Sequence, residues 1–277
     1  MTVAKDHSRR LWRLRAQARW GQRASNLLWR ARHDGSDFSI VSNNCWGGSI
    51  YQSLRRPYLS PFVGMFLMAP CYLRLLEDLR GQLAHPPRPL AESRYEAIRL
   101  TRGRGSPRYP IGVLGDDVEV HFLHYASWDE ALAKWTRRCA RIRWDRLFVK
   151  FGDQNESSAE CVRRFLALPF SRKLCLTNRT DAAAAGAVHV GGRGFTTRLQ
   201  EDVGFRRHVD VPHWLCDGRT RGGVVLARAN RRADRFAAAA ATRYHDARIA
   251  AGEEPEMNLD ELVARLRASS GGSTCGI

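Results

Sequence analysis

The chain has 277 residues, of which 44% are hydrophobic, and its formal net charge is +17 at pH 7. That length suits one large domain or two small ones. No run reaches the roughly 18 consecutive apolar residues that cross a bilayer, and the first residues lack the apolar run of a signal peptide. The seven cysteines are odd in number and form no CxxC pair, which argues against a disulfide framework and a zinc ribbon. The composition therefore predicts a reduced, cytoplasmic protein.

The positive charge is concentrated in two parts of the chain. Residues 1–33 carry nine basic residues and one acid, and residues 193–250 carry twelve arginines, no lysine and six acids. This distribution is typical of chains that contact phosphates, nucleic acid or an anionic membrane surface. An alternative is a GC-rich genome that favours arginine codons. Nucleic acid is the least favoured partner, because no helix-turn-helix, zinc-finger or RNP signature is present.

The chain begins with a basic, tryptophan-rich helical extension, predicted over residues 1–35. Strand and helix signals then alternate through residues 36–217, with strands predicted at 38–41, 118–125, 147–151, 173–178 and 187–192. Alternation of this kind is typical of α/β domains. It predicts a Rossmann-like layered fold with a mostly parallel sheet flanked by helices, and an antiparallel strand pair around residues 111–125.

Helix starts are marked by proline and by capping boxes. Pro70 is predicted to open a helix that reaches residue 83, and Ser127 with Glu130 and Ser157 with Glu160 predict two capped helices. Residues 218–268 are predicted to add a C-terminal strand, at the sequence GGVVLARA, together with helices. Residues 269–277 are predicted to form a disordered tail.

The segment SNNCWGG, residues 42–48, lies between a predicted strand and a helix-like stretch. Ligands of open α/β sheets bind beyond the carboxyl ends of the strands. Gly47 and Gly48 remove side chains where backbone N–H groups would face a ligand, and the following helix N-terminus favours an anion. Asn43 and Asn44 supply further donors and acceptors. The segment matches neither the dinucleotide nor the P-loop fingerprint, and the alternative is a tight turn whose tryptophan covers the core.

Other predicted strand ends carry polar residues in the same way. Asp153 follows the strand at 147–151, and Asn178 ends the strand at 173–178. Parallel strands would bring both to the edge of the sheet that holds the SNNCWGG segment. Lys150 lies within a buried strand and needs a partner to keep its charge, which makes it a candidate site residue. The alternative is a lysine that extends to solvent near the strand end.

The block GDDVEVHFLHY, residues 115–125, carries a candidate acid–base pair. In an extended strand, His121 and His124 point to opposite faces and cannot readily bind one metal. Glu119 and His121 share a face and suit a base with the carboxylate that orients it. Cys45 with His121 would suit nucleophilic catalysis. The alternatives are structural histidines and a small core cysteine.

Five blocks between about residues 36 and 180 carry a family resemblance. In chain order they are FSIVSNNCWGGSIYQSL, PYLSPFVGMFLMAPCYLRLLEDL, YPIGVLGDDVEVHFLHY, KWTRRCARIRWDRLFVKFGD and FLALPFSRKLCLT. Together they resemble a bacterial family of exopolysaccharide biosynthesis proteins that is built on a domain of unknown function. The resemblance implies an α/β fold and a role in making capsule, exopolysaccharide or lipopolysaccharide. It assigns no catalytic residue, and it covers neither the basic N-terminal extension nor the arginine-rich region after residue 190.

Taken together, these observations predict a cytoplasmic transferase that acts on a sugar-containing substrate, either nucleotide-linked or lipid-linked. The predicted catalytic residues are His121, Glu119, Asp153 and Cys45. The predicted substrate-binding residues are Asn43, Asn44, Trp46, Gly47, Gly48, Asp116, His124, Lys150 and Asn178. No cofactor or metal is required, although Asp116 and Asp153 would suit Mg²⁺ if a nucleotide-sugar binds. The alternative is a non-catalytic assembly protein of the same pathway that reaches the inner face of the membrane through residues 1–33.

Overall fold

The computed structural model describes residues 2–101, 109–192, 196–216, 220–254 and 256–271. The chain forms two compact units, and each unit combines segments that are distant in sequence. Unit 1 comprises Met1–Phe38, Ser49–Pro57 and Arg198–Glu256, and unit 2 comprises Ser39–Gly48, Tyr58–Thr197 and Met257–Ile277. The N-terminal extension thus belongs to the same unit as most of the C-terminal helices, and the residues predicted as one α/β domain are divided between the units.

Unit 2 is built on a four-stranded parallel sheet in the order β1-β5-β6-β7. Its strands are β1 (Ser39–Ser42), β5 (Leu147–Gly152), β6 (Lys173–Thr177) and β7 (Val188–His189). Helices α7 (Ala159–Ala167) and α8 (Thr180–Ala184) connect β5 to β6 and β6 to β7 as crossover helices. The predicted Rossmann-like α/β fold with a parallel sheet is confirmed.

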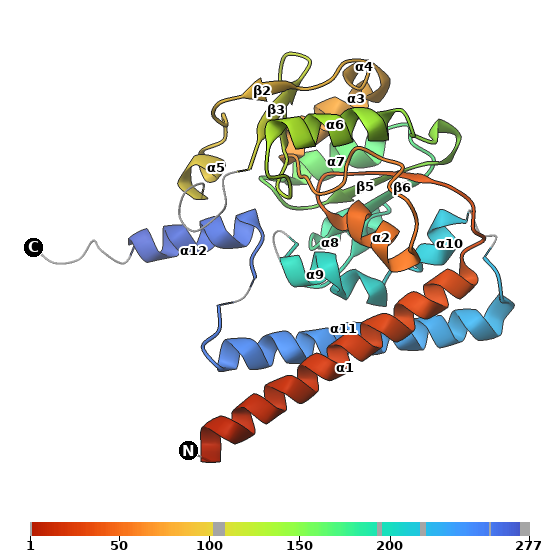
Figure 1. Ribbon diagram of the computed structural model, residues 1–277, viewed down its shortest axis with the longest axis vertical. Helices are drawn as coiled ribbons and strands as arrows, with labels where there is room; N and C mark the ends of the chain where they lie inside the picture. Colours follow the sequence, from red (N-terminus) through yellow and green to blue (C-terminus); the bar gives the residue numbers. More distant parts are fainter. Residues whose placement is uncertain (1, 102–108, 193–195, 217–219, 255, 272–277) are drawn as a thin grey trace, which may run out of the picture. The chain divides into compact units, whose positions relative to one another are not determined.

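One face of this sheet carries the main hydrophobic core of unit 2. Val41, Val149, Phe151 and Cys175 alternate onto that face and are buried. The core also contains residues of α3 (Ala69–Glu77), α6 (Trp128–Cys139) and α7, helices that Figure 1 places around the strands. The period of two along each strand therefore separates the core face from the face that carries Lys150.

A second sheet in unit 2 is antiparallel, in the order β2-β3-β4. Its strands are β2 (Arg88–Leu90), β3 (Ile111–Leu114) and β4 (Val118–His121). The predicted antiparallel pair is confirmed, but β4 ends at His121 instead of continuing to residue 125. The remaining elements of unit 2 are α4 (Leu79–Gln82), α5 (Glu96–Thr101), the 3-10 helix η1 (Trp144–Arg146) and α12 (Leu259–Gly271).

The helix caps agree with the sequence in part. Pro70 lies in the first turn of α3, and Ser127 accepts a hydrogen bond from the Glu130 amide at the start of α6, both as predicted. The cap of α7 is Ser158, which accepts from the Cys161 amide, so the prediction that Ser157 is the cap was wrong by one residue. The helix predicted from Pro70 to residue 83 is interrupted at Asp78, which leaves the helical region of φ and ψ and caps α4.

Unit 1 is helical. Its elements are α1 (Thr2–Arg32), α9 (Arg198–Asp202), the 3-10 helix η2 (Gly204–Arg207), α10 (Val211–Leu215) and α11 (Gly223–Ala250), with most of α2 (Trp46–Leu54). Figure 1 shows α1 and α11 lying side by side. The strand predicted at GGVVLARA was wrong, because this sequence begins α11. Its alanines and arginines are strong helix formers, and Val224 and Val225 face solvent. The predicted tail starts within α12, and residues 272–277 lie outside the described residues.

Helix α1 carries two stripes on opposite faces. Gly21, Ser25 and Trp29 are buried, and Gly21 lies against Phe236 and Ala237 of α11. The exposed stripe holds large apolar side chains, namely Trp12 (71% exposed), Trp20 (64%) and Leu27 (61%). At 3.6 residues per turn these three lie within about 80° of one another, opposite the buried stripe. The sequence of α1 therefore shows no single apolar stripe, because its apolar residues are divided between the buried face and the exposed face.

None of the helices in the described ranges has the length and apolarity that crossing a bilayer would require.

Candidate functional site

The carboxyl edge of the parallel sheet gathers several of the predicted site residues. The SNNCWGG segment follows β1, Asp153 follows β5 and Asn178 follows β6. Since β1, β5 and β6 are parallel neighbours, these strand ends meet at one edge. The topology is the one in which α/β proteins bind ligands beyond the strand ends.

Asn43 is tied into the sheet itself. Its Nδ2 donates to the Gly152 carbonyl at 2.9 Å, and the Gly152 amide donates to its Oδ1 at 2.8 Å. The side chain thus adds one rung to the ladder between β1 and β5 after Ser42 and Lys150 pair. Both polar atoms of the buried amide are therefore used inside the protein, and this pairing supports the ends of β1 and β5.

Asn44, Trp46 and Lys150 form one buried cluster. The Oδ1 atom of Asn44 accepts hydrogen bonds from Ser42 Oγ and the Trp46 amide, both at 3.1 Å, and from Lys150 Nζ at 3.4 Å. The ammonium of Lys150 also lies 5.6 Å from the centroid of the Trp46 ring. The fully buried lysine therefore contacts an amide oxygen and an aromatic face.

Gly47 and Gly48 lie in the first turn of α2, because this helix begins at Trp46, earlier than predicted. A Cβ atom on Gly47 would lie 3.1 Å from Ile40 Cγ2, and one on Gly48 would lie 3.2 Å from Val63 Cγ1. These distances are shorter than ordinary carbon–carbon contacts. Close packing against β1 and Val63 therefore accounts for both glycines.

Asp153 is the site residue whose bonding is incomplete. Its carboxylate is fully buried, and Oδ2 accepts hydrogen bonds from Thr177 Oγ1 at 2.6 Å and Arg179 Nε at 3.0 Å. The other oxygen, Oδ1, is buried without a hydrogen-bond partner, and so is the hydroxyl of Ser157. Arg179 reaches both residues, since its Nη2 donates to the Ser157 carbonyl at 3.3 Å. Buried polar atoms are nearly always paired, so two such atoms beside one guanidinium call for an explanation.

The loop after Asp153 binds a carboxylate. Asn155 and Glu156 have φ angles of 60° and 59°, a left-handed conformation that is uncommon for residues other than glycine. Their consecutive amides both donate to the carboxylate of Asp260 in α12. Burial raises the pKa of Asp260, and the nearby charge of Asp153 raises it further. The amides of this loop are therefore occupied by a carboxylate of the chain itself, whose ionised form is disfavoured by burial and by the charge of Asp153.

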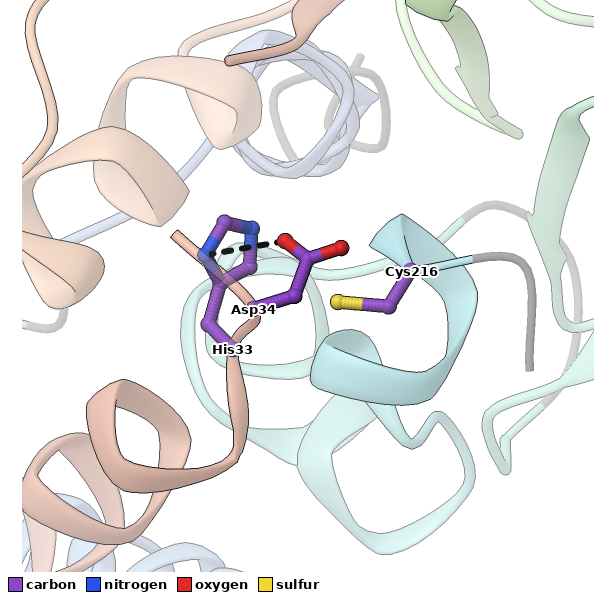
Figure 2. A group of neighbouring side chains, drawn as sticks. All are labelled: His33, Asp34 and Cys216. Atoms are coloured by element: carbon purple, nitrogen blue, oxygen red, sulfur yellow. Dashed lines mark ion pairs between the residues drawn. The ribbon is translucent and has the colours of Figure 1, made fainter. Parts of the chain in front are cut away.

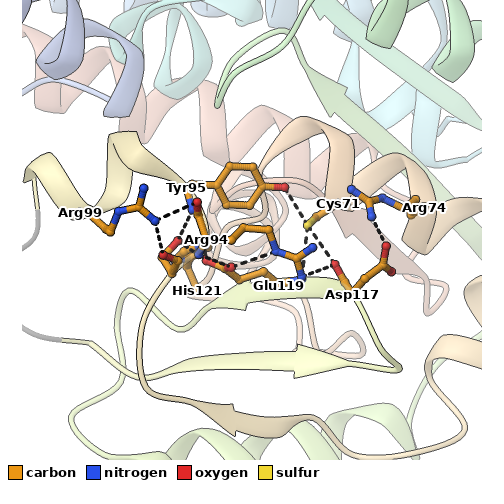
Figure 3. A network of polar contacts seen from close by, with 9 residues as sticks. Cys71, Arg74, Arg94, Tyr95, Arg99, Asp117, Glu119 and His121 are labelled. Atoms are coloured by element: carbon orange, nitrogen blue, oxygen red, sulfur yellow. Dashed lines mark hydrogen bonds and ion pairs between the residues drawn. The ribbon is translucent and has the colours of Figure 1, made fainter.

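Glu119 and His121 lie on the same face of β4, as their spacing predicts (Figure 3). Both side chains are fully buried, and His121 Nε2 lies 3.0 Å from Glu119 Oε1. The ring of Phe66 stacks on the imidazole with centroids 4.5 Å apart. The histidine is thus held by a carboxylate at one edge and by an aromatic ring on one face.

Further donors converge on Glu119. The hydroxyl of Ser93 and the amide of Arg94 donate to its two oxygens, the amide at 3.1 Å. Burial raises the pKa of Glu119, but hydrogen bonds from His121, Ser93 and the Arg94 amide outweigh this effect and leave the pKa below its ordinary value. The carboxylate is therefore ionised at neutral pH and orients the imidazole.

Cys71 lies in the same network. Its thiol contacts the Tyr95 hydroxyl at 3.0 Å and accepts from the Glu119 amide at 3.3 Å. Burial raises the pKa of the Cys71 thiol, so the nucleophilic thiolate is disfavoured. Figure 3 shows Asp117 and Arg74 as an ion pair at the end of this network.

A short segment links this network to the carboxyl edge. Phe66 and His121 exchange backbone hydrogen bonds at 3.0 Å in both directions. The next residue, Leu67, donates to the Asn43 carbonyl at 2.9 Å and accepts from Asn155 Nδ2 at 3.2 Å. Residues 66 and 67 therefore bridge the two groups of predicted site residues through the backbone.

Three other predicted residues lie away from both groups or are engaged with the backbone. Asp116 is exposed in the turn between β3 and β4, and His124 is exposed beyond the end of β4. Within the described residues, neither Asp116 nor Asp153 joins a cluster of three side chains able to hold a metal. The thiol of Cys45 is half-buried and contacts the Met65 carbonyl at 3.6 Å.

Sequence reasoning missed four residues that complete these groups. Thr177 and Arg179 flank Asn178 at the end of β6, so the rule that found Asn178 also applies to them. Ser93 contacts Glu119, and Asp260 contacts the loop after Asp153. Asp260 comes from a distant part of the chain, and Ser93 lies 26 residues before Glu119. No pattern in the sequence marks either residue, because only the fold brings them close.

Two comparisons with known proteins identify relatives of this chain. Residues 18–204 match the family described as Domain of unknown function (DUF1919). An uncharacterized protein of Haemophilus influenzae is 32% identical over 154 residues, which cover 56% of this chain and 68% of that protein. The family match includes the whole parallel sheet, Asp153, and the Glu119–His121 pair. Because it spans well over half of the chain, this protein belongs to the DUF1919 family.

Proposed function

We propose that this protein is a transferase of bacterial surface-polysaccharide biosynthesis that binds a sugar-containing substrate at the carboxyl edge of its parallel sheet. The observation that carries the proposal is the buried carboxylate of Asp153, whose Oδ1 has no hydrogen-bond partner. The five sequence blocks that resemble exopolysaccharide biosynthesis proteins support the choice of pathway.

The chemistry of Asp153 suits a sugar hydroxyl. A hydroxyl can donate to the unpaired Oδ1 and accept from the unpaired hydroxyl of Ser157. Arg179 Nε pairs with the other carboxylate oxygen at 3.0 Å and fixes its position. A ligand that pairs two otherwise unsatisfied buried atoms gains specificity, because an analogue without the hydroxyl leaves them unpaired.

His121 is the acid–base residue of this proposal. The ionised Glu119 holds Nε2, so Nδ1 is the atom that would exchange a proton with substrate. Both side chains are fully buried, and the ring of Phe66 covers one face of the imidazole. Because the imidazole is fully buried, a substrate reaches Nδ1 only if neighbouring groups move.

A second candidate function is favoured by the exposed stripe of α1. Trp12, Trp20 and Leu27 face solvent on a helix rich in arginine. Tryptophan and arginine together suit the interface of an anionic bilayer. This feature fits a non-catalytic assembly protein at the cytoplasmic face of the membrane, and it also fits an enzyme that meets a lipid-linked substrate there.

The test is complementation of a deletion strain, with the surface glycan analysed by composition and linkage. Asp153→Asn keeps the shape of the side chain and removes its charge, so it should abolish complementation while circular dichroism stays unchanged. The matched control is Asp181→Asn, an exposed aspartate of α8, which should complement fully. His121→Asn should reduce product by roughly 100-fold.

Each outcome separates the candidates. Full complementation by folded Asp153→Asn and His121→Asn would exclude catalysis at this edge and leave the assembly role. A deletion strain whose glycan is unaltered would reject the pathway itself.

A further inference from the structure

We propose that His33, Asp34 and Cys216 form a binding site for a zinc-class divalent ion within unit 1 (Figure 2). One ligand atom from each of the three side chains lies within 4.8 Å of the other two. His33 is 4% exposed and Cys216 is 2% exposed, whereas Asp34 is 30% exposed. The cluster is thus buried on the side of the histidine and cysteine, and reachable from solvent through the aspartate.

The fold holds the two parts of this cluster together. His33 and Asp34 follow the last residue of α1, and Cys216 is the C-cap residue of α10. Arg32, at the end of α1, forms an ion pair with Asp210 at 2.6 Å, and Asp210 caps the start of α10. This pair joins the end of α1, which precedes the histidine and the aspartate, to the start of α10, the five-residue helix that the cysteine ends. The three side chains therefore sit on supported elements, as a metal site requires.

The spacing suits a shared ion. Three atoms that lie within 4.8 Å of one another have a common point within about 2.8 Å of each, compared with roughly 2.0–2.3 Å for bonds from zinc to nitrogen, oxygen and sulfur. Small side-chain rotations close that difference. His33 Nδ1 and Asp34 Oδ1 are already 3.8 Å apart. A water molecule would complete a tetrahedral shell on the exposed side.

The same spacing argues against a catalytic triad of these residues. In a cysteine–histidine–aspartate triad the imidazole lies between its partners, which places sulfur and carboxylate about 7 Å apart. Here the sulfur and a carboxylate oxygen lie within 4.8 Å of each other. A compact triangle of this kind is the arrangement of ligands around one ion and not of a proton relay.

The donor set selects the ion. A thiolate and an imidazole prefer zinc over magnesium or calcium, which take oxygen ligands. The Ser36 amide donates to Asp34 Oδ1 at 2.9 Å and holds that carboxylate in place. The Gly35 amide donates to His33 Nδ1 at 3.0 Å, so coordination through Nδ1 replaces one hydrogen bond. The expected affinity is accordingly that of a three-ligand site and not that of a four-cysteine structural site.

The experiment uses the full-length chain, reduced and freed of metal, and titrated with Co²⁺. We expect one equivalent to bind with thiolate-to-cobalt absorption in the near ultraviolet, and Zn²⁺ to displace it. Cys216→Ser should remove this absorption. Asp34→Asn, which changes a partly exposed residue, should keep the absorption and weaken binding by roughly 10- to 100-fold.

The matched control is Cys139→Ser, a half-buried cysteine of α6 in unit 2, which should bind like the unchanged chain. Circular dichroism checks the fold of each variant, and Zn²⁺ should raise the Tm of the unchanged chain more than that of Asp34→Asn. Lack of thiolate absorption in the unchanged chain, or its persistence in Cys216→Ser, overturns the proposal. Equal Co²⁺ affinity of the unchanged chain and Asp34→Asn removes the aspartate from the site.

Discussion

Asn43 and Gly152 exchange two hydrogen bonds, at 2.9 and 2.8 Å, across the ends of β1 and β5. A side-chain amide thus takes the place of a backbone pair at the point where the strands stop pairing. Both polar atoms of this side chain are used within the sheet, and they set the geometry of the edge that carries Asp153. Replacing Asn43 should therefore lower the free energy of unfolding, and any loss of activity should follow from that loss of stability.

The first prediction is that Asn43→Ala lowers the free energy of unfolding by about 2–4 kcal/mol, because it leaves the amide and carbonyl of Gly152 unpaired in a buried setting. Urea unfolding measures the effect. Asn178→Ala, at the end of the next strand, is the comparison variant. An Asn43→Ala protein of full stability that fails to complement the deletion strain would return this residue to the binding site.

The second prediction concerns Gly48. A Cβ atom there meets Val63 Cγ1 at 3.2 Å, so Gly48→Val should lower the free energy of unfolding by about 1–3 kcal/mol through overpacking. Val63→Ala removes the atom that clashes and should recover part of this loss in the double variant. If Gly48→Val is as stable as the unchanged chain yet inactive, a role in approaching a ligand is favoured over packing.

The third prediction follows from a buried network between α1 and α11. Trp29 Nε1 and Asn230 Nδ2 donate to the Asp234 carboxylate at 3.0 and 2.6 Å, and Arg206 lies 3.8 Å from it. Burial raises the pKa of Asp234 from 3.8 to about 6, although hydrogen bonds from Ser25 and Trp29 and the charge of Arg206 oppose the shift. Burial likewise lowers the pKa of Arg206 to about 10.

The sign of the pH dependence follows from the raised pKa. Between about pH 4 and 6 the folded chain holds a proton on Asp234 that the unfolded chain has lost, so stability from this group falls as pH rises through that window. The total is about 3 kcal/mol. Asp234→Asn mimics the protonated form and should remove this fall, as measured by urea unfolding at several pH values. An unchanged slope in Asp234→Asn would assign the pH dependence to other groups.

The fourth prediction concerns the exposed stripe of α1. The full-length protein should float with anionic vesicles and not with neutral ones, and rising salt should weaken the association. Trp12→Ala combined with Leu27→Ala should reduce flotation by at least about tenfold, because these side chains are exposed and can enter the bilayer interface.

Point variants are preferable to removal of residues 1–33, because Trp29 of α1 is buried and bonded to Asp234 of α11. The matched control is Val225→Ala, a highly exposed apolar residue of α11 outside the stripe. An equal loss of flotation in this control would show that any exposed apolar side chain contributes to vesicle binding. Flotation that does not change in the α1 variants would show that the stripe is not the membrane contact.

Much of the fold of unit 2 can be predicted from short segments of the sequence. The nearly continuous apolar runs of β1, β5 and β6 predict a sheet buried on both faces, and the helical segments between predicted strands favour a parallel arrangement. The positions of Asp153 and Asn178 at one edge follow from that topology. Glu119 and His121 share a face because residues two apart in a strand always do.

What the tertiary structure alone decided is how each polar group is used. Asn43 and Gly47 look like ligand contacts in the sequence, but neighbouring atoms of the sheet account for both. The sequence places Asp153 at a strand end, but only the structure shows that its carboxylate is buried with one oxygen unpaired. Hydrogen-bond satisfaction depends on atoms brought together from distant segments, and no local pattern records it.

The assembly of unit 1 shows the same limit. The sequence determined that α1 is helical, basic and rich in tryptophan, because these are properties of composition and short-range propensity. It did not determine that Trp29 pairs with Asp234 or that His33 and Asp34 meet Cys216. Each of these contacts joins residues that are distant in the sequence. The packing of α1 against α10 and α11 brings them together, and this packing is a property of the folded chain and not of any single segment.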